Sequence, residues 1–293
     1  MRAAGDTWDI VTSVGFTALS VCASRALDAS LTPPLANDEY AAGFVAAAGE
    51  PTLAAAVAEV DLSSGAATNA KWVGVRTRFF DDFFTRAAQS QILQVVILAA
   101  GLDSRAYRLP WHAGTVVFEV DQPKVLEFKQ RVLDQSGALP SARRSAVAVD
   151  LRDDWAAALR RAGFDAGEPS AWALEGLLPY LPGEAQDRLF ENLHDLAVVG
   201  SELAVELGPD RGEVQEFHDA LPIDGDELPR VGDLWYDDAR RDTKAWLTDR
   251  GWTIAGVDLV DKAAREYHRP LDDLFPVFER FMRTKYFTAT RTQ

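Results

Sequence analysis

The pattern of hydrophobic and polar positions changes near residue 92 of this 293-residue chain. Before that point, alanine-rich stretches alternate with turn-forming residues, and no alternation typical of strands occurs. The turn-forming breaks fall at residues 33–34, 49–51 and 63–65. We therefore interpret residues 1–90 as a cap of about three or four helices. Four phenylalanines between positions 79 and 84 follow helical spacing, which is typical of packing in a core.

After residue 92, apolar stretches alternate with amphipathic ones. Strands are predicted at residues 93–99, 115–120, 144–149, 170–175, 201–207, 252–258 and near 281–289. Helices are predicted at 123–135, 153–162, 184–198 and 239–250. Repeated strand–helix units imply a parallel sheet with helices on both faces, and we expect the last strands to form an antiparallel hairpin. The predicted fold is a doubly wound α/β seven-stranded Rossmann-like sheet over 91–293, with an ordered insertion around 221–238.

The stretch from Val95 to Arg105 is the most informative part of the chain. An apolar run ends in the small residues Ala99, Ala100 and Gly101, and the next predicted strand ends in Asp121. Such a run fits a strand buried on both faces, and small residues let the backbone approach a ligand closely. A carboxylate at the end of the following strand can accept the hydroxyls of a ribose. The pattern predicts a nucleoside-binding crevice.

The glycine spacing indicates which nucleoside fits. Gly101 is the one glycine of the turn, so neither the Gly-x-Gly-x-x-Gly pattern nor a Gly-Lys-Ser/Thr phosphate loop occurs. A pyrophosphate-bearing cofactor such as NAD is therefore disfavoured, although an NAD-dependent oxidoreductase stays a rival interpretation. A nucleoside without phosphates, such as S-adenosyl-L-methionine, needs only the turn and the acid. A binding protein that merely holds the nucleoside is a third possibility.

Composition and charge exclude several other classes. The formal charge of −15 disfavours nucleic acid, which needs a basic face. Cys22 is the one cysteine, so neither an internal disulfide nor a cysteine-based zinc site is expected, and no metal site is predicted. The first residues do not resemble a signal peptide, and the polar residues within 10–27 argue against a membrane span. We expect a cytoplasmic protein.

Five ordered motifs resemble the leucine carboxyl methyltransferase superfamily. They lie at residues 76–82, 98–105, 118–123, 149–151 and 174–181. The opening at 13–19 is similar to the branch of S-adenosylmethionine-dependent methyltransferases abundant in mycobacteria and related actinobacteria. Ala99 departs from the glycine that the family often has at this position.

The resemblance implies a role for each matching polar residue. Asp121 would accept the ribose hydroxyls, and Glu175 and Arg76 would bind the ammonium and carboxylate of the methionine part. Asp150 would accept from the adenine amino group, and the Leu151 amide would donate to the ring. Ala99 and Gly101 would form the turn beneath the cofactor. The alternatives stay open: Asp121 and Asp150 could cap helices, and Arg76 could pair with Asp81 or Asp82. Four further charged residues fit ligand contacts and solvated charges equally well: Arg25, Arg78, Asp103 and Arg105.

The resemblance also implies the reaction class. We expect O-methylation of a small-molecule carboxylate, with methylation of a hydroxyl on a polyketide-like metabolite as the alternative. The four histidines, His112, His194, His218 and His268, form no catalytic or metal-binding motif. A carboxylate of pKa about 4 is already ionised and needs no base, whereas an alcohol usually needs one. The sequence assigns no catalytic residue, and we expect the helical cap and the insertion to form the acceptor pocket.

Overall fold

A computed structural model describes residues 13–60, 65–208, 235–236, 238–271 and 284–293. Within these residues the strands form one seven-stranded sheet in the order β3-β2-β1-β4-β5-β7-β6. The strands are β1 (Gln94–Leu98), β2 (Val116–Asp121), β3 (Arg143–Ala148), β4 (Ser170–Leu174), β5 (Glu202–Leu207), β6 (Trp252–Leu259) and β7 (Lys285–Arg291). The first five strands run parallel, and β7 runs antiparallel to both β5 and β6. The predicted seven-stranded α/β fold and its antiparallel end are confirmed.

The amino-acid pattern of each strand matches its place in the sheet. Every residue of β1 and β4 is buried, as expected for apolar strands covered on both faces. At the sheet edge, β3 begins with Arg143 and Arg144 and is mostly exposed or half-buried. Charged side chains on an edge strand discourage pairing with another chain. The central strands β1 and β4 are therefore packed on both faces, and the turns that follow them start from the core.

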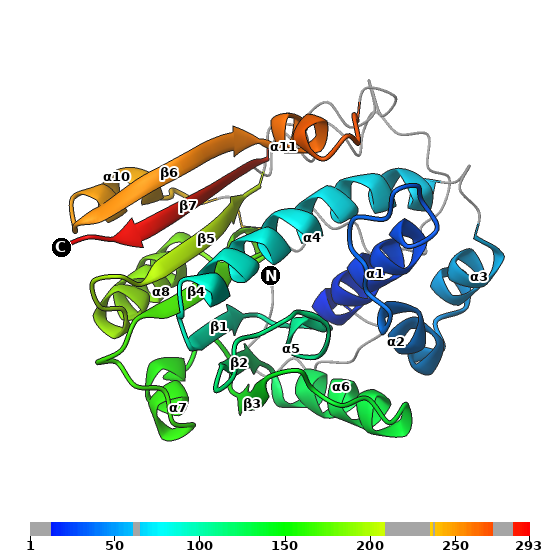
Figure 1. The fold of residues 1–293 in the computed structure, drawn as a ribbon, viewed down its shortest axis with the longest axis horizontal. Helices are drawn as coiled ribbons and strands as arrows, with labels where there is room; N and C mark the ends of the chain where they lie inside the picture. The colour runs from blue at the N-terminus through cyan, green and yellow to red at the C-terminus, as the bar shows by residue number, and fades with distance from the viewer. Residues whose placement is uncertain (1–12, 61–64, 209–234, 237, 272–283) are drawn as a thin grey trace.

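Helices cover both faces of the sheet (Figure 1). On one face lie α1 (Ser13–Asp28), α2 (Ala41–Ala48), α4 (Gly65–Gln89) and α6 (Pro123–Gln135). The opposite face carries α7 (Trp155–Arg161), α8 (Gly183–Leu196) and α10 (Thr243–Thr248). The phenylalanines of α4 pack with Val95, Ile97 and Ala173 of the sheet, so the aromatic stripe is core, as predicted. This packing places Arg76 of α4 beside the ends of β4 and β5.

The helix predictions agree with the structure except for the short elements. Residues 13–89 contain four described helices, α3 (Pro51–Glu59) among them, and α6 spans the predicted 123–135. The pattern did not predict the short α5 (Arg105–Arg108), η1 (Leu178–Tyr180) and α11 (Val260–Glu266). One or two turns are too short to show an amphipathic period. The predicted insertion at 221–238 lies outside the described residues apart from Trp235, Tyr236 and Asp238, and the division at residue 90 stays a prediction.

None of the helices in the described ranges is long and apolar enough to cross a membrane.

Candidate active site

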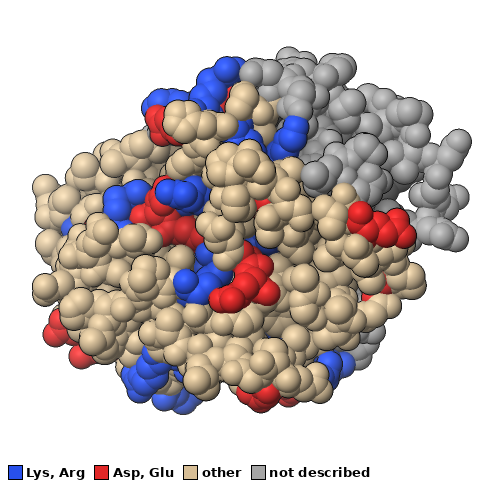
Figure 2. Space-filling model, turned by 45° about the vertical axis from the view of Figure 1, so that its right-hand side comes forward, with Lys and Arg blue, Asp and Glu red and all other residues tan. Residues whose placement is uncertain are grey.

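Charged side chains gather inside the molecule near the carboxyl ends of the strands, although the chain is acidic. Seven of them are buried: Arg25, Asp38, Arg76, Asp81, Asp103, Arg105 and Glu206. On the outside, Figure 2 shows acidic and basic side chains adjoining one another in the middle of a mostly uncharged face. Charges removed from water are costly unless they are paired, so their concentration at one place marks a candidate site.

The turn after β1 brings the backbone against the end of β2. Ala99 and Gly101 both have positive φ, 54° and 49°. The Gly101 amide donates to Asp121 Oδ2 at 2.6 Å, and the Ala100 amide donates to the Val120 carbonyl at 3.2 Å. A left-handed conformation suits glycine better than alanine, which gives a physical reason for the glycine that the family often has at position 99. From α1, Ala18 lies 3.5 Å from where a Cβ on Gly101 would be, so α1 closely covers this turn.

Both carboxylate oxygens of Asp121 already accept backbone hydrogen bonds. Oδ2 accepts from Gly101, and Oδ1 accepts from the Gln122 amide at 2.6 Å. Burial raises the pKa of Asp121 to about 6, against the lowering effect of these two amides. Among the described residues, Asp121 accepts from the amides of Gly101 and Gln122, and Gln122 precedes α6, so Asp121 is not the helix cap that its position allowed. Each oxygen keeps a lone pair for a ribose hydroxyl.

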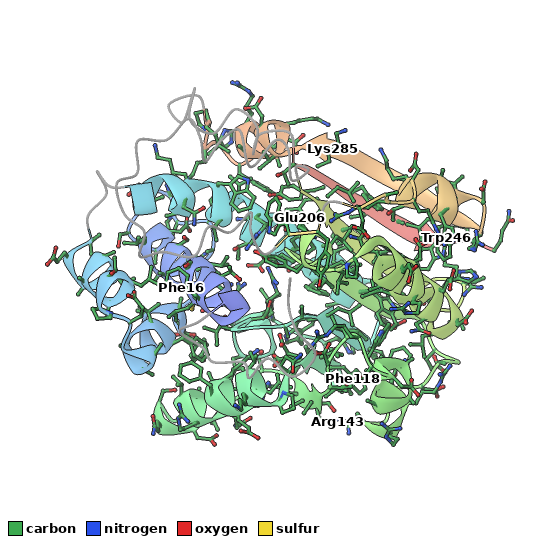
Figure 3. All side chains as sticks on the ribbon, turned by 180° about the vertical axis from the view of Figure 1, so that it is seen from behind. Phe16, Phe118, Arg143, Glu206, Trp246 and Lys285 are labelled. Carbon is green, nitrogen blue, oxygen red and sulfur yellow. The ribbon has the colours of Figure 1, made fainter. Side chains whose placement is uncertain are left out.

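Arg76 lies between two carboxylates at the ends of neighbouring strands. Its Nε is 3.0 Å from Glu175 Oε1, and its Nη1 is 3.6 Å from Glu206 Oε2. Its guanidinium also stacks over the Trp72 ring, 4.9 Å from the centroid. Glu206 accepts the Gly176 amide at 2.6 Å and is buried, and Figure 3 labels it near the middle of the view. The alternative that Arg76 pairs with Asp81 or Asp82 on its own helix is therefore wrong. Glu206 is a site residue that the sequence analysis missed.

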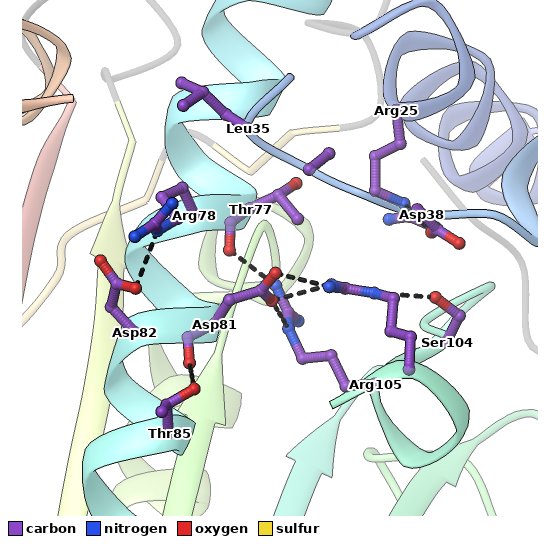
Figure 4. A network of polar contacts seen from close by, with 12 residues as sticks. Arg25, Leu35, Asp38, Thr77, Arg78, Asp81, Asp82, Thr85, Ser104 and Arg105 are labelled. Atoms are coloured by element: carbon purple, nitrogen blue, oxygen red, sulfur yellow. Dashed lines mark hydrogen bonds and ion pairs between the residues drawn. The ribbon is translucent and has the colours of Figure 1, made fainter. Parts of the chain in front are cut away.

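Arg105 joins three carboxylates from three parts of the chain, and Figure 4 shows its contact with one of them, Asp81. Its Nε donates to Asp81 Oδ1 at 2.6 Å, and its Nη1 donates to Glu175 Oε2 at 2.8 Å and to Asp103. Asp81 also pairs with Arg108 at 2.5 Å. Arg105 is 2% exposed, so it is not a solvated charge. Although burial opposes ionisation, Arg105 and then Arg76 hold the pKa of Glu175 below its usual value.

Asp150 and Leu151 lie just beyond the end of β3. Asp150 accepts from the Gln122 side chain, and it forms a turn by accepting the Arg152 amide at 2.8 Å. Helix α7 is capped by Asp154, so the alternative that Asp150 caps it is wrong. Although burial opposes ionisation, the hydrogen bonds from Arg152 lower the pKa of Asp150. Leu151 is half-buried and packs against the core.

Two arginines that could have been ligand contacts have other partners. Arg25 of α1 pairs with Asp38 at 2.7 Å and donates to the Leu102 carbonyl at 2.7 Å. Arg25 therefore ties α1 to the loop that follows β1. Arg78 pairs with Asp82 at 2.8 Å on its own helix, and its side chain is 43% exposed. Arg78 is thus a surface ion pair on α4.

The structure brings the predicted residues together at the carboxyl ends of the parallel strands. One of these residues stands at or just after the end of each of the first four strands: Ala99 for β1, Asp121 for β2, Asp150 for β3 and Glu175 for β4. Arg76 reaches the same ends of the strands from α4. Open α/β sheets bind ligands at these ends. Across the described residues, no group of histidine, cysteine and acidic side chains could hold a metal ion. Burial raises the pKa of Cys22 to about 12, so its thiol stays protonated.

Comparison with known proteins identifies the family. The family model for leucine carboxyl methyltransferase matches residues 18–194. A protein from Mycobacteroides abscessus is 63% identical over 99% of this chain and 98% of its own length. Another from Rhodococcus jostii is 47% identical over 99% of this chain and 100% of its own length. Both are named for S-adenosyl-L-methionine-dependent methyl transfer.

A solved structure was also compared with the chain. Magnesium protoporphyrin IX methyltransferase from Synechocystis PCC 6803, crystallised with bound S-adenosylhomocysteine, is 16% identical. It aligns with a TM-score of 0.47 over 76% of this chain and 87% of its own. The chain is a Rossmann-like methyltransferase on the strength of its sheet and its sequence relatives. It belongs to the leucine carboxyl methyltransferase family.

Proposed function

We propose that this enzyme transfers the methyl group of S-adenosyl-L-methionine to a carboxylate of a small molecule and forms a methyl ester. The cofactor follows from the family match and from relatives that carry it in their names. At the carboxyl ends of the strands, Arg76, Asp121 and Glu175 have charges that complement the groups of this cofactor. The ester product is our interpretation of the site, and it rests on how the described acids, arginines and histidines are placed.

The pair formed by Glu175 and Arg76 is the observation that carries the proposal. The amino-acid part of the cofactor is a zwitterion, which needs one anion and one cation close together. Glu175 Oε1 and Arg76 Nε are 3.0 Å apart, and both side chains are at most 12% exposed. Arginine can bind a carboxylate through two parallel N–H groups, which suits the second half of the zwitterion. At the other end, Asp121 offers its remaining lone pairs to the ribose.

The placement of three histidines supports a carboxylate acceptor, and the fourth, His218, lies outside the described residues. Of those in the described part of the chain, His112 and His268 are exposed. His194 accepts from Trp252 Nε1 at 3.2 Å, where β6 begins, at the edge of the sheet opposite the site. When a carboxylate is methylated, an O–C bond forms, the C–S bond breaks, and the anion and the sulfonium neutralise each other. No proton has to leave, so the site needs orientation and exclusion of water rather than a base.

One observation favours a hydroxyl acceptor as the second candidate. Glu206 is a buried carboxylate at the site edge, and burial raises its pKa above the usual value. A carboxylate with a raised pKa could take the proton that an alcohol or phenol must lose. In that reaction the Glu206 carboxylate would become protonated as the O–C bond forms. A polyketide-like alcohol would then be the acceptor.

The acceptor side is proposed to lie between the helical cap of residues 1–90 and the insertion around 221–238, above the core of 91–293. The described end of the insertion supports this placement. The Tyr236 amide donates to the Pro179 carbonyl at 3.1 Å. The Trp235 ring lies edge-on to Tyr180, with centroids 6.2 Å apart. Pro179 and Tyr180 come four and five positions after Glu175, so the described end of the insertion packs close to the site.

The acceptor class is tested by the stability of the product. The enzyme is incubated with cell extract and cofactor labelled in the methyl group, and the labelled product is then exposed to mild alkali. A methyl ester releases labelled methanol, as the proposal expects. An alkali-stable product would be an ether and would establish the hydroxyl alternative, and a heat-inactivated enzyme provides the control.

A further inference from the structure

Glu175 and Glu206 occupy adjacent positions at the ends of two neighbouring parallel strands. Leu174 of β4 is in register with Val205 of β5, so the next residue on each strand is a glutamate. Glu206 is 5% exposed, and the Glu175 side chain is 12% exposed. Like charges side by side in a sheet are destabilising, and burial increases the cost. A feature that costs stability without improving packing is expected at functional sites.

The surroundings of Glu206 show what its charge contributes. Glu206 contacts the site through Oε2, which accepts from Gly176 at 2.6 Å and lies 3.6 Å from Arg76 Nη1. Gly176 directly follows Glu175 and has a φ of 60°, and a Cβ placed on it would lie 3.4 Å from Arg76 Nη1. Opposite Glu206 in register, Tyr286 has a buried hydroxyl without a hydrogen-bond partner in the described part of the chain. Glu206 thus joins the turn after β4 to the guanidinium of Arg76.

Glu175 alone cannot hold Arg76 in place. Its Oε2 is already taken by Arg105 at 2.8 Å, and its Oε1 faces Arg76 at 3.0 Å. When the ammonium group of the cofactor also binds Glu175, three cations share this carboxylate: Arg76, Arg105 and the ammonium. Arg76 then needs a second anion to stay oriented, because a buried guanidinium without a counter-ion is costly. Glu206 is the acid whose position meets this need.

We infer that Glu206 is a positioning residue for the amino-acid part of the cofactor: it holds Arg76 so that the guanidinium faces the cofactor carboxylate. The inference rests on the proposed role of Arg76 in binding that carboxylate. Glu206 does not itself touch the cofactor. Its charge acts on one end of the ligand only, so the adenosine end should bind normally without it.

Two ligands that differ by the amino-acid group test this role. S-adenosylhomocysteine carries the group, and 5′-methylthioadenosine lacks it, so the ratio of their dissociation constants isolates that end of the site. In Glu206→Gln, the side-chain oxygen still accepts from Gly176 but the charge is lost. The affinity for S-adenosylhomocysteine should fall by about 10-fold to 100-fold. This is the range for losing one charged hydrogen bond, here the one between Arg76 and the carboxylate of the ligand. The affinity for 5′-methylthioadenosine should stay within about twofold of the wild-type value.

Two further variants separate positioning from other effects. Glu206→Asp keeps the charge and should recover most of the lost affinity for S-adenosylhomocysteine. Glu202→Gln removes the same charge from the other end of β5, opposite Thr290, and should change neither dissociation constant. Calorimetric titration measures all of these values, and thermal unfolding shows whether each variant is folded.

The outcomes distinguish this inference from the proposed function. Equal losses for both ligands in Glu206→Gln would show a merely structural role and overturn the inference. Unchanged binding with lost methyl transfer would also overturn it and would favour Glu206 as a base. If the wild-type protein itself binds both ligands equally well, Arg76 has no role toward the amino-acid group, and the proposed site fails together with this inference.

Discussion

Replacing Asp121 by asparagine is expected to weaken cofactor binding about as much as replacing it by alanine. An amide keeps one acceptor oxygen, so residue type alone suggests a mild effect. In the structure, however, each oxygen of Asp121 accepts a backbone amide at 2.6 Å, one from Gly101 and one from Gln122. Whichever way the asparagine amide is rotated, its NH₂ group faces one of these N–H donors. The turn beneath the cofactor must then shift or lose a hydrogen bond.

The size of the effect follows from the groups that lose their partners. A hydrogen bond to a charged group contributes about 1.5–3 kcal/mol, and a buried donor left unsatisfied costs about 1–3 kcal/mol. We therefore expect both Asp121→Asn and Asp121→Ala to weaken cofactor binding by about 1–3 kcal/mol, or about 5-fold to 150-fold in the dissociation constant.

Isothermal titration with S-adenosylhomocysteine measures this loss directly. Asp134→Asn is the matched control, because Asp134 is exposed on α6 and accepts a hydrogen bond from the Gln130 side chain of the same helix. It should bind the ligand like the wild-type protein. An Asp121→Asn variant that is folded and binds within twofold of wild type would refute the reasoning. Asp121 would then not be the ribose acceptor.

Three other perturbations test separate parts of the structure. Arg76→Lys should weaken S-adenosylhomocysteine binding nearly as much as Arg76→Ala, because one ammonium cannot reproduce contacts made through Nε and Nη1. Cofactor affinity, measured by calorimetry between pH 5 and 8, should fall as the pH drops through about 6, because Asp121 then gains a proton. Lys129→Met should lower the free energy of unfolding in urea by about 3 kcal/mol, near the lower end for breaking a buried ion pair, since Glu119 keeps Arg144 as a partner.

Each of these expectations has a result that would contradict it. A lysine variant at position 76 with wild-type affinity would show that only general positive charge matters there. If the cofactor affinity of the wild-type protein does not change with pH, as expected for Asp121→Asn, protonation of Asp121 does not affect binding. For Lys129→Met, a loss below about 1 kcal/mol would mean that the pair with Glu119 is not a stabilising contact.

The sequence predicted the central strands β1 and β4 well because each is an apolar run between turn residues. The predicted range 170–175 contains β4 (Ser170–Leu174), whose residues are all buried. The order of the acids along the chain also sufficed to place Asp121 and Glu175 at the ends of strands. Parallel strands end at the same edge, so residues far apart in sequence meet there.

The partners of the charged residues could not be read from the sequence. Arg76 has two acids five and six positions further along its own helix, but it faces β4 and β5 instead. Arg105 resembles a surface charge in a short loop, and only the packing of α4 on the sheet buries it beside Asp81. Glu206 sits at the end of an apolar strand, and a buried acid in that position was the one signal that could have revealed it. Glu119, two residues before Asp121, is fully buried and paired with Lys129, so it is not a second ribose acceptor.

The central claim is that the carboxyl edge of this sheet binds S-adenosyl-L-methionine as the methyl donor. Titration of the wild-type protein with S-adenosylhomocysteine and, separately, with NAD tests it most directly. We expect S-adenosylhomocysteine to bind with a measurable heat at one site per chain, and NAD to give no heat. Asp121→Ala should weaken the binding of S-adenosylhomocysteine. Binding of NAD without binding of S-adenosylhomocysteine would contradict the account.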